Sequence, residues 1–192
     1  MIDKIKSVCD YLEITCVVIG GIALPAYGVS RSTIDLDLCV HFKDQIQLNN
    51  FIQNLKEVGI STAQKPKIDH DLFVIFDTKI PDEAEIWLRP CDRFPWDEEM
   101  LKNVRSVDGF DFKVLAPEDF IMTKLGRQDR SVIDTDDVVQ VLLSNLEDIN
   151  WSYLFKRSKM YNLENILIDI LRYIVKNSPD FKFEEQVLKF IK

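Results

Sequence analysis

The sequence predicts an α+β fold, with a β-sheet flanked by helices in residues 1–115 and a helical region in residues 116–192. Short apolar runs of strand length alternate with amphipathic segments of helical spacing in the first part. After residue 115, apolar residues recur at helical spacing and no further strand pattern occurs. We expect the second part to pack on the first as one compact unit.

The composition is that of an ordinary globular domain, with 46% hydrophobic and 29% charged residues among 192. No apolar run approaches the roughly 18 residues of a membrane span, and the N-terminus lacks a signal-peptide pattern. The four cysteines lie far apart without a Cys-x-x-Cys pair, so neither a zinc site nor a disulfide framework is expected. These features predict a cytoplasmic protein with no membrane partner.

The net charge of −8 is unevenly distributed along the chain. Residues 151–192 contain eight Lys and Arg against five Asp and Glu, a charge of +3, which leaves −11 for residues 1–150. An acidic surface disfavours broad, non-specific binding of nucleic acid. A phosphate-bearing substrate can still bind locally, through a basic patch or a bound metal.

Each element follows from a local pattern. Apolar residues at helical spacing predict a helix over 2–13, and a buried strand follows over 16–19. We expect a short helix over 21–27, limited by Pro25 and ended by Gly28, because proline lacks the amide hydrogen and glycine favours a helix end. A strand is predicted over 34–40.

The later elements are read in the same way. A helix around 48–58 ends at Gly59, a hairpin joins strands 72–76 and 84–88, and Asp108-Gly109 indicates a second hairpin. Ala116-Pro117-Glu118-Asp119 is typical of a helix start. Further helices are predicted over about 118–125, 132–144, 150–160, 163–177 and 180–191.

One motif points to phosphate chemistry. Gly20-Gly21 follows the apolar Val18-Ile19, and thirteen residues later the chain carries Asp35-Leu36-Asp37-Leu38. Alternate strand residues point the same way, so Asp35 and Asp37 are expected to project together. Mg²⁺ is usually held by one or two carboxylates plus substrate phosphates, and glycine lets the backbone approach phosphate.

This motif resembles the signature of the polymerase-β-like nucleotidyltransferase superfamily. The stretch from Gly20 to Asp37, with Gly-Gly-x-Ala, Tyr-Gly, Arg-x-Thr and Asp-x-Asp in order, resembles its AbiEii-like branch of stand-alone, toxin–antitoxin-type nucleotidyltransferases. Residues 114–125, with Asp134 and Asp137 beyond them, resemble that branch's later block. The resemblance covers roughly residues 15–145. It implies a nucleotidyltransferase-type mixed sheet flanked by helices, followed by a C-terminal helical region.

The resemblance also implies a site. Asp35 and Asp37 would bridge Mg²⁺ to a nucleoside triphosphate (NTP), such as ATP, whose phosphates Gly20 and Gly21 cradle. A third carboxylate on a neighbouring strand would complete the catalytic and metal-binding set. Glu85 lies in the strand where the family usually places Asp and is favoured, whereas Asp71 is its rival.

Other residues are candidates with plain alternatives. Lys124 is expected to contact the triphosphate, although an exposed helix lysine would give the same pattern. Arg31 and Thr33 could contact phosphate or sugar, although Arg31 could instead pair with a nearby acid. Two groups stay open: the acids Asp134, Asp136 and Asp137 fit either a helix N-cap or the site, and Lys156, Arg157 and Lys159 fit either a solvated face or an acceptor contact.

The predicted function is Mg²⁺-dependent transfer of a nucleoside monophosphate from an NTP to an RNA, including tRNA, or a protein acceptor. The branch resemblance adds a role in a toxin–antitoxin system, with a cognate toxin or antitoxin as partner. The alternative is a catalytically inactive nucleotide-binding or regulatory module of the same fold. Which NTP and which acceptor are used does not follow from the sequence.

Overall fold

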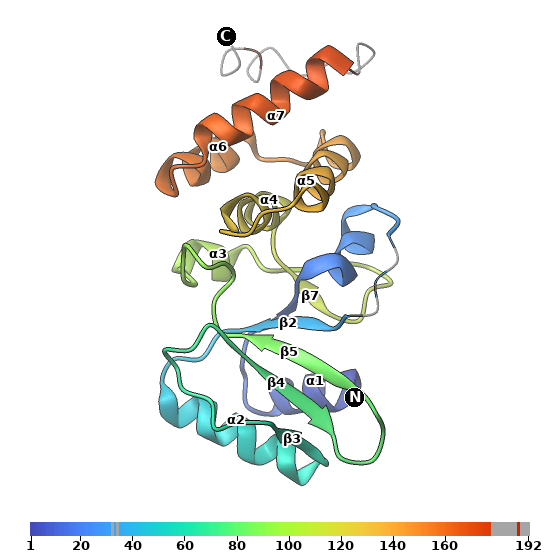
Figure 1. Ribbon diagram of the computed structural model, residues 1–192, viewed down its shortest axis with the longest axis vertical. Coiled ribbons are helices and arrows are strands. Elements are labelled where there is room, and N and C mark those ends of the chain that lie inside the picture. Colours follow the sequence, from blue (N-terminus) through green and yellow to red (C-terminus); the bar gives the residue numbers. More distant parts are fainter. Residues whose placement is uncertain (32, 34, 178–187, 189–192) are drawn as a thin grey trace.

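The computed structural model describes residues 1–31, 33, 35–177 and 188 (Figure 1). Its strands are β1 (Cys16–Val18), β2 (Asp37–Val40), β3 (Ile60–Thr62), β4 (Leu72–Asp77), β5 (Glu83–Trp87), β6 (Arg105–Ser106) and β7 (Lys113–Val114). Its helices are α1 (Ile2–Tyr11), the 3-10 helix η1 (Gly20–Tyr27), α2 (Gln45–Glu57), α3 (Glu98–Lys102), α4 (Pro117–Gly126), α5 (Val132–Ser144), α6 (Trp151–Met160) and α7 (Glu164–Asn177).

The seven strands form one mixed sheet in the order β3-β4-β5-β2-β1-β7-β6. The central strand β2 runs antiparallel to β1 and parallel to β5, and β1 runs parallel to β7. The two predicted hairpins are present as the antiparallel pairs β4–β5 and β6–β7. The predicted α+β class, a mixed sheet flanked by helices with a helical region after it, is confirmed.

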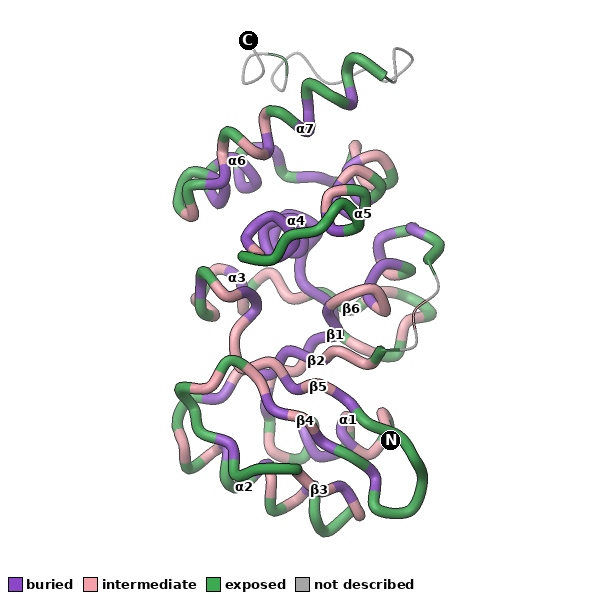
Figure 2. The backbone as a smooth tube through the Cα atoms, viewed as in Figure 1, coloured by how far each residue is buried: buried purple, intermediate pink, exposed green. Residues whose placement is uncertain are grey.

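The larger helices lie on either side of the sheet along the long axis. Figure 1 places α2 at the lower end and stacks α4, α5, α6 and α7 toward the upper end, and α1 packs against α2. Every residue of α4 is buried, and Figure 2 marks this helix as buried along its length. Helix α4 packs against α5 and α6, so it forms the centre of the helical layer. No described helix is long and apolar enough to cross a membrane.

The structure differs from the predicted elements in a few places. The predicted strand 34–40 begins only at Asp37, so Asp35 lies in the preceding loop, and residue 34 is outside the described residues. The short elements β3 and α3 were not predicted. The predicted helix 180–191 falls, apart from Leu188, outside the described residues.

Candidate functional site

The structure brings Asp37 and Glu85 side by side. Asp37 is the first residue of β2, and the parallel register pairs it with Glu85 of β5. Paired residues of adjacent strands are about 5 Å apart and share one face of the sheet. The backbone N–H of Glu85 donates to the carbonyl of Leu36 at 3.0 Å, which extends this pairing by one residue. Two carboxylates from different strands therefore meet at the entrance of β2.

The first glycine lies directly against this pair. Gly20 opens η1 with a φ of +65°, and a Cβ at this position would collide with Oδ2 of Asp37. The backbone N–H of Ile19 donates to the carbonyl of Asp37 at 3.0 Å. Only glycine fits this close approach, because any side chain would meet the carboxylate and would also adopt an unfavourable φ.

Asp35 and Thr33 lie in the loop before β2. Asp35 is exposed, and its backbone N–H donates to Oγ1 of Thr33 at 3.4 Å. A Cβ on Gly21 would meet the side chain of Thr33 at 3.2 Å, so the second glycine packs against this loop. The loop thus connects the glycine turn to the carboxylates.

Asp71 lies elsewhere. Its carboxylate pairs with Nε of Arg89 at 3.0 Å and its side chain is 61% exposed. The residue opposite Glu85 on β4 is Val74, three positions along from Asp71. At about 3.3 Å per residue, Asp71 lies roughly 10 Å further along the sheet than the Asp37–Glu85 pair.

The pKa of Asp37 reports its surroundings. This pKa is raised from its ordinary value of 3.8 to about 6, first by burial and then by the charges of Glu85 and Asp35, whereas Lys124 and Arg127 lower it in part. Two carboxylates close to a partly buried third disfavour its charged form. A cation at this position would relieve that repulsion.

A small cavity of about 50 Å³ opens beside Asp37. Its lining residues are Ile19, Gly20, Asp37, Trp87, Pro90, Cys91, Asp92, Thr123, Lys124 and Arg127. A cavity of this size holds only small groups, such as water molecules or an ion. Two larger grooves, each of about 780 Å³, lie between α2 and the segment 62–66 and between α5 and α7, away from the carboxylates.

Four polar or aromatic lining residues were not predicted: Trp87, Asp92, Thr123 and Arg127. Thr123 precedes Lys124 on α4, and Arg127 directly follows the end of that helix. The predicted position of Lys124 is therefore the sequence signal from which both residues could have been found. Asp92 accepts a hydrogen bond from the backbone N–H of Gln128 at 3.3 Å, which ties the loop after β5 to the end of α4. This tertiary contact leaves no trace in the local sequence.

Lys124 is buried rather than exposed. Its Nζ lies 2.8 Å from Oδ2 of Asp137 and 3.2 Å from Oδ1 of Asp134, both on α5. Asp134 is held in turn by a capping box with Ser131, the N-cap of α5. Burial alone would raise the pKa of Asp134, but hydrogen bonds from Ser131 and the charge of Lys124 lower it below its ordinary value.

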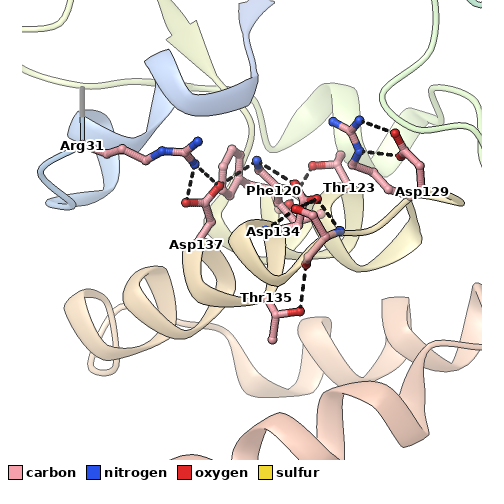
Figure 3. Close-up of polar contacts among 10 residues, drawn as sticks. Arg31, Phe120, Thr123, Asp129, Asp134, Thr135 and Asp137 are labelled. Carbon is pink, nitrogen blue, oxygen red and sulfur yellow. Dashed lines mark hydrogen bonds and ion pairs between the residues drawn. The ribbon is translucent and has the colours of Figure 1, made fainter. Parts of the chain in front are cut away.

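Asp137 also binds Arg31, which comes from the loop after η1. Nη1 of Arg31 lies 2.7 and 2.6 Å from the two oxygens of Asp137, and Figure 3 shows these side chains meeting between the loop and α5. The Asp137 side chain is only 3% exposed. One buried carboxylate therefore holds the two predicted nucleotide-binding cations, Arg31 and Lys124.

The basic cluster predicted on α6 does not form a surface patch. Arg157 is fully buried and pairs with Asp119 of α4 and with Asp97 before α3. Lys156 pairs with Glu99 and Lys159 pairs with Glu164. Arg157 points into the core because it lies on the same face of α6 as the buried apolar residues. The sequence of charges alone does not indicate this.

The site suits a hard divalent cation held jointly with a substrate. In the part of the chain that the structure describes, no three His, Cys, Asp or Glu side chains converge as a complete metal cage. Mg²⁺ does not require one, since it usually takes one or two carboxylates and completes its shell with water and phosphate. Asp37 and Glu85 provide oxygen donors of this kind, and the absence of a side chain on Gly20 lets the Asp37 carboxylate lie directly against the glycine turn.

Comparisons with known proteins identify the fold. Neither a protein-family model nor a curated protein sequence matches the chain. The solution structure of the antibiotic-resistance factor ANT(2'')-Ia matches with a TM-score of 0.54 at 12% identity, over 90% of this chain and 95% of that one. Its crystal structure with adenylyl-2''-tobramycin matches with a TM-score of 0.54 at 13% identity, over 84% and 94%.

A third solved structure agrees. An antigenic nucleotidyltransferase-like protein from Paracoccidioides brasiliensis matches with a TM-score of 0.51 at 17% identity, over 93% of this chain and 90% of that one. At these identities the similarity establishes a shared fold. The chain therefore has a nucleotidyltransferase fold, and its assignment to the AbiEii-like branch stays a prediction.

Proposed function

We propose that this chain is a metal-dependent nucleotidyltransferase that moves a nucleoside monophosphate from an NTP to an acceptor. The observation that carries the proposal is the register pairing Asp37 with Glu85, with the bare backbone of Gly20 against Oδ2 of Asp37. Two carboxylates and a glycine turn are the parts that metal-bound phosphate chemistry requires. The nucleotidyltransferase fold supports the same reading.

Each residue has a stated task. Asp37, at the start of β2, and Asp35, in the loop before it, would hold Mg²⁺, and Glu85 of β5 would add the third carboxylate. When bound, the ion neutralises charge on the triphosphate and polarises the phosphoryl group that is attacked. A carboxylate of this set accepts the proton of the acceptor hydroxyl as that hydroxyl attacks the α-phosphate, and pyrophosphate leaves.

The glycine backbone and the two cations, Lys124 and Arg31, are proposed to contact the triphosphate. Gly20 and Gly21 allow its phosphates to approach the start of η1. Lys124 lines the cavity and supplies positive charge near the departing pyrophosphate. Arg31 and Thr33 act from the loop beside it. Because Asp137 binds both Lys124 and Arg31, their charges stay fixed before the nucleotide arrives.

Two classes of acceptor are proposed, one from the family resemblance and one from the net charge of the chain. The AbiEii-like branch favours an RNA, such as a tRNA, or a protein acceptor, with a toxin or antitoxin as partner. A second candidate is a small cationic acceptor of the aminoglycoside type. It is favoured by the net charge of −8 and by the similarity to a protein solved with adenylyl-2''-tobramycin.

Labelling tests the proposal. The full chain is incubated with Mg²⁺, each of the four α-labelled NTPs, and separate panels of tRNA, protein and aminoglycoside acceptors. We expect the wild type to label one acceptor class, and D37N, D35N and E85Q to fall below about one-hundredth of its rate. D71N is the matched control, since Asp71 pairs with Arg89 away from the carboxylates.

The outcomes separate the alternatives. Equal labelling by wild type and D37N would refute metal-assisted transfer at this site. Loss of labelling in D71N but not in E85Q would identify Asp71, instead of Glu85, as the third carboxylate. Tight NTP binding by calorimetry, with no transfer to any acceptor, would instead favour the inactive nucleotide-binding module.

A further inference from the structure

The indole of Trp87 is hydrogen-bonded to the carboxylate of Glu85. Its Nε1–H donates to Oε2 at 3.0 Å. The two residues are two positions apart on β5, so their side chains lie on the same face of the sheet. Trp87 also lines the cavity beside Asp37. An aromatic donor thus joins the third carboxylate to the wall of the site.

This contact bears on a departure from the family pattern. Where the resemblance leads one to expect Asp, the chain has Glu85, whose side chain has one more rotatable bond. A longer, freer carboxylate spends less time in any one geometry, and fixing it costs rotamer entropy. Asp37 and Glu85 come from different strands. The two carboxylates can therefore bind one ion only if the side chain of Glu85 is held in one orientation.

Trp87 can hold it. The indole N–H can only donate a hydrogen bond and does not titrate. Trp87 is therefore the donor in this contact at every pH. The ring is half-buried, and its backbone is paired on both sides, with Cys39 of β2 and with Leu72 of β4. Among the described residues, none donates a hydrogen bond to the other oxygen, Oε1. That oxygen is left for an incoming ion.

We propose that Trp87 is a positioning residue for the metal site: its indole N–H holds Oε2 of Glu85 and so presents Oε1 to Mg²⁺. The inference rests on the proposed function and extends it, since it states why glutamate serves where aspartate is expected. Partners that orient a metal ligand typically change metal affinity 10- to 100-fold when removed.

The principal test is W87F, which keeps an aromatic ring of similar bulk and removes the N–H. Mg²⁺ is titrated calorimetrically onto protein saturated with a non-hydrolysable analogue of the NTP that the wild type uses. We expect the Kd for Mg²⁺ to rise about 10-fold. The KM for the NTP at saturating Mg²⁺ should change much less. W96F is the matched control, because Trp96 packs on His41 and does not line the cavity.

A double-mutant cycle separates positioning from general packing. If Trp87 acts through Glu85, then W87F weakens Mg²⁺ binding in the wild type but has no further effect in E85Q. Additive effects of W87F and E85Q would overturn the inference, and so would a Kd in W87F equal to that in W96F. Thermal unfolding of each variant confirms that it is folded.

A spectroscopic readout is independent of activity. In a ¹H–¹⁵N spectrum, the Trp87 indole signal is the one that disappears in W87F. We expect this signal to shift in E85Q and on addition of Mg²⁺ with the NTP analogue. A signal unmoved by E85Q would overturn the hydrogen bond. Failure of the wild type to bind or transfer any NTP would refute the proposed function, whereas normal Mg²⁺ affinity in W87F with defective E85Q would refute this inference alone.

Discussion

At the residue scale, the site combines a bare backbone with a carboxylate that resists ionisation. Gly20 leaves no space for a side chain, and burial together with the charges of Glu85 and Asp35 raises the pKa of Asp37 to about 6. A site for a divalent cation is expected to be unfavourable when the cation is absent. Two predictions test these features, one for the Asp37 carboxylate and one for the Gly20 backbone.

The first concerns D37N in metal-free buffer. The folded chain binds the Asp37 proton more tightly than the unfolded chain, so ionisation of Asp37 lowers stability as pH rises from about 4 to about 6. Removing the charge should stabilise the protein by about 1 kcal/mol at pH 7, after allowance for solvent screening. That corresponds to a rise in Tm of about 2–4 °C.

The pH dependence provides the check. The difference in Tm between D37N and the wild type should vanish near pH 4, where both side chains are neutral in the folded state. D35N is the control, because Asp35 is exposed and its removal relieves less repulsion. A D37N variant less stable than the wild type at pH 7 would contradict the prediction.

The second concerns G20A. Alanine at a φ of +65° costs about 1–2 kcal/mol, and its Cβ would also displace the Asp37 carboxylate. G109A is the matched control, since Gly109 has a φ of +76° but no atom within 4 Å of the place that a Cβ would occupy. Urea unfolding should show a loss in both variants, larger in G20A. Labelling should be lost only in G20A.

At the element scale, one carboxylate connects three segments. Asp137 of α5 holds Lys124 of α4 and Arg31 of the loop that leads to β2. The loop carrying Asp35 is therefore attached to the helical layer through a partly buried ion pair, in which the Asp137 side chain is buried and Arg31 is not. Removing one partner of such a group leaves uncompensated charge.

D137N should accordingly destabilise the protein by about 3 kcal/mol in urea unfolding, because Lys124 is buried and loses half of its carboxylate contacts. It should also weaken NTP binding, because Arg31 and Lys124 lose their fixed positions. D136N is the matched control on the same helix, with an exposed side chain, and should change stability by less than about 0.5 kcal/mol. Equal losses in the two variants would contradict this account.

Elements with strong local patterns were predictable, and those that depend on partners were not. The α1 and α2 patterns and both hairpins were read correctly, because helical spacing and turn residues act locally. The three-residue β3 exists only through its pairing with β4, and no local signal specifies it. The strand predicted over 34–40 begins at Asp37, where the pairing with Glu85 of β5 begins.

The site was predictable in part for the same reason. The glycines and the Asp-x-Asp spacing lie within one segment, so sequence alone indicates them. The pairing of Asp37 with Glu85 depends on a register between strands 48 positions apart, which no local pattern encodes. Trp87 and Arg127 join the cavity only through tertiary packing. The roles of these residues stay predictions, as does a domain boundary at residue 115.

At the scale of the whole molecule, a buried cation holds the helical layer together. Arg157 of α6 pairs with Asp119 of α4 at 2.9 Å and with Asp97 at 2.5 Å, and the hydroxyl of Tyr153 donates to Asp119 at 2.9 Å. The layer thus has a polar centre beside its apolar contacts. This centre lies far in sequence from the carboxylates of the sheet.

R157M should therefore lower the free energy of unfolding by about 3–5 kcal/mol, because Asp119 keeps a buried charge without its partner. K156M is the matched control, since Lys156 is exposed and its pair with Glu99 should contribute about 0–1 kcal/mol. Urea unfolding followed by circular dichroism measures both. A small effect of R157M would mean that apolar packing alone holds α6 on α4.

The residues that line the cavity come from four separate segments of the chain, and the ribosome synthesises these segments one after another. The cavity walls come from Ile19 and Gly20, from Asp37, from Trp87 to Asp92, and from Thr123 to Arg127. A nascent chain that has not yet exposed Arg127 lacks one wall, although both carboxylate strands are already present. A truncated translation product that ends before Thr123 would therefore carry the acids but lack three of the residues that line the pocket, Thr123, Lys124 and Arg127.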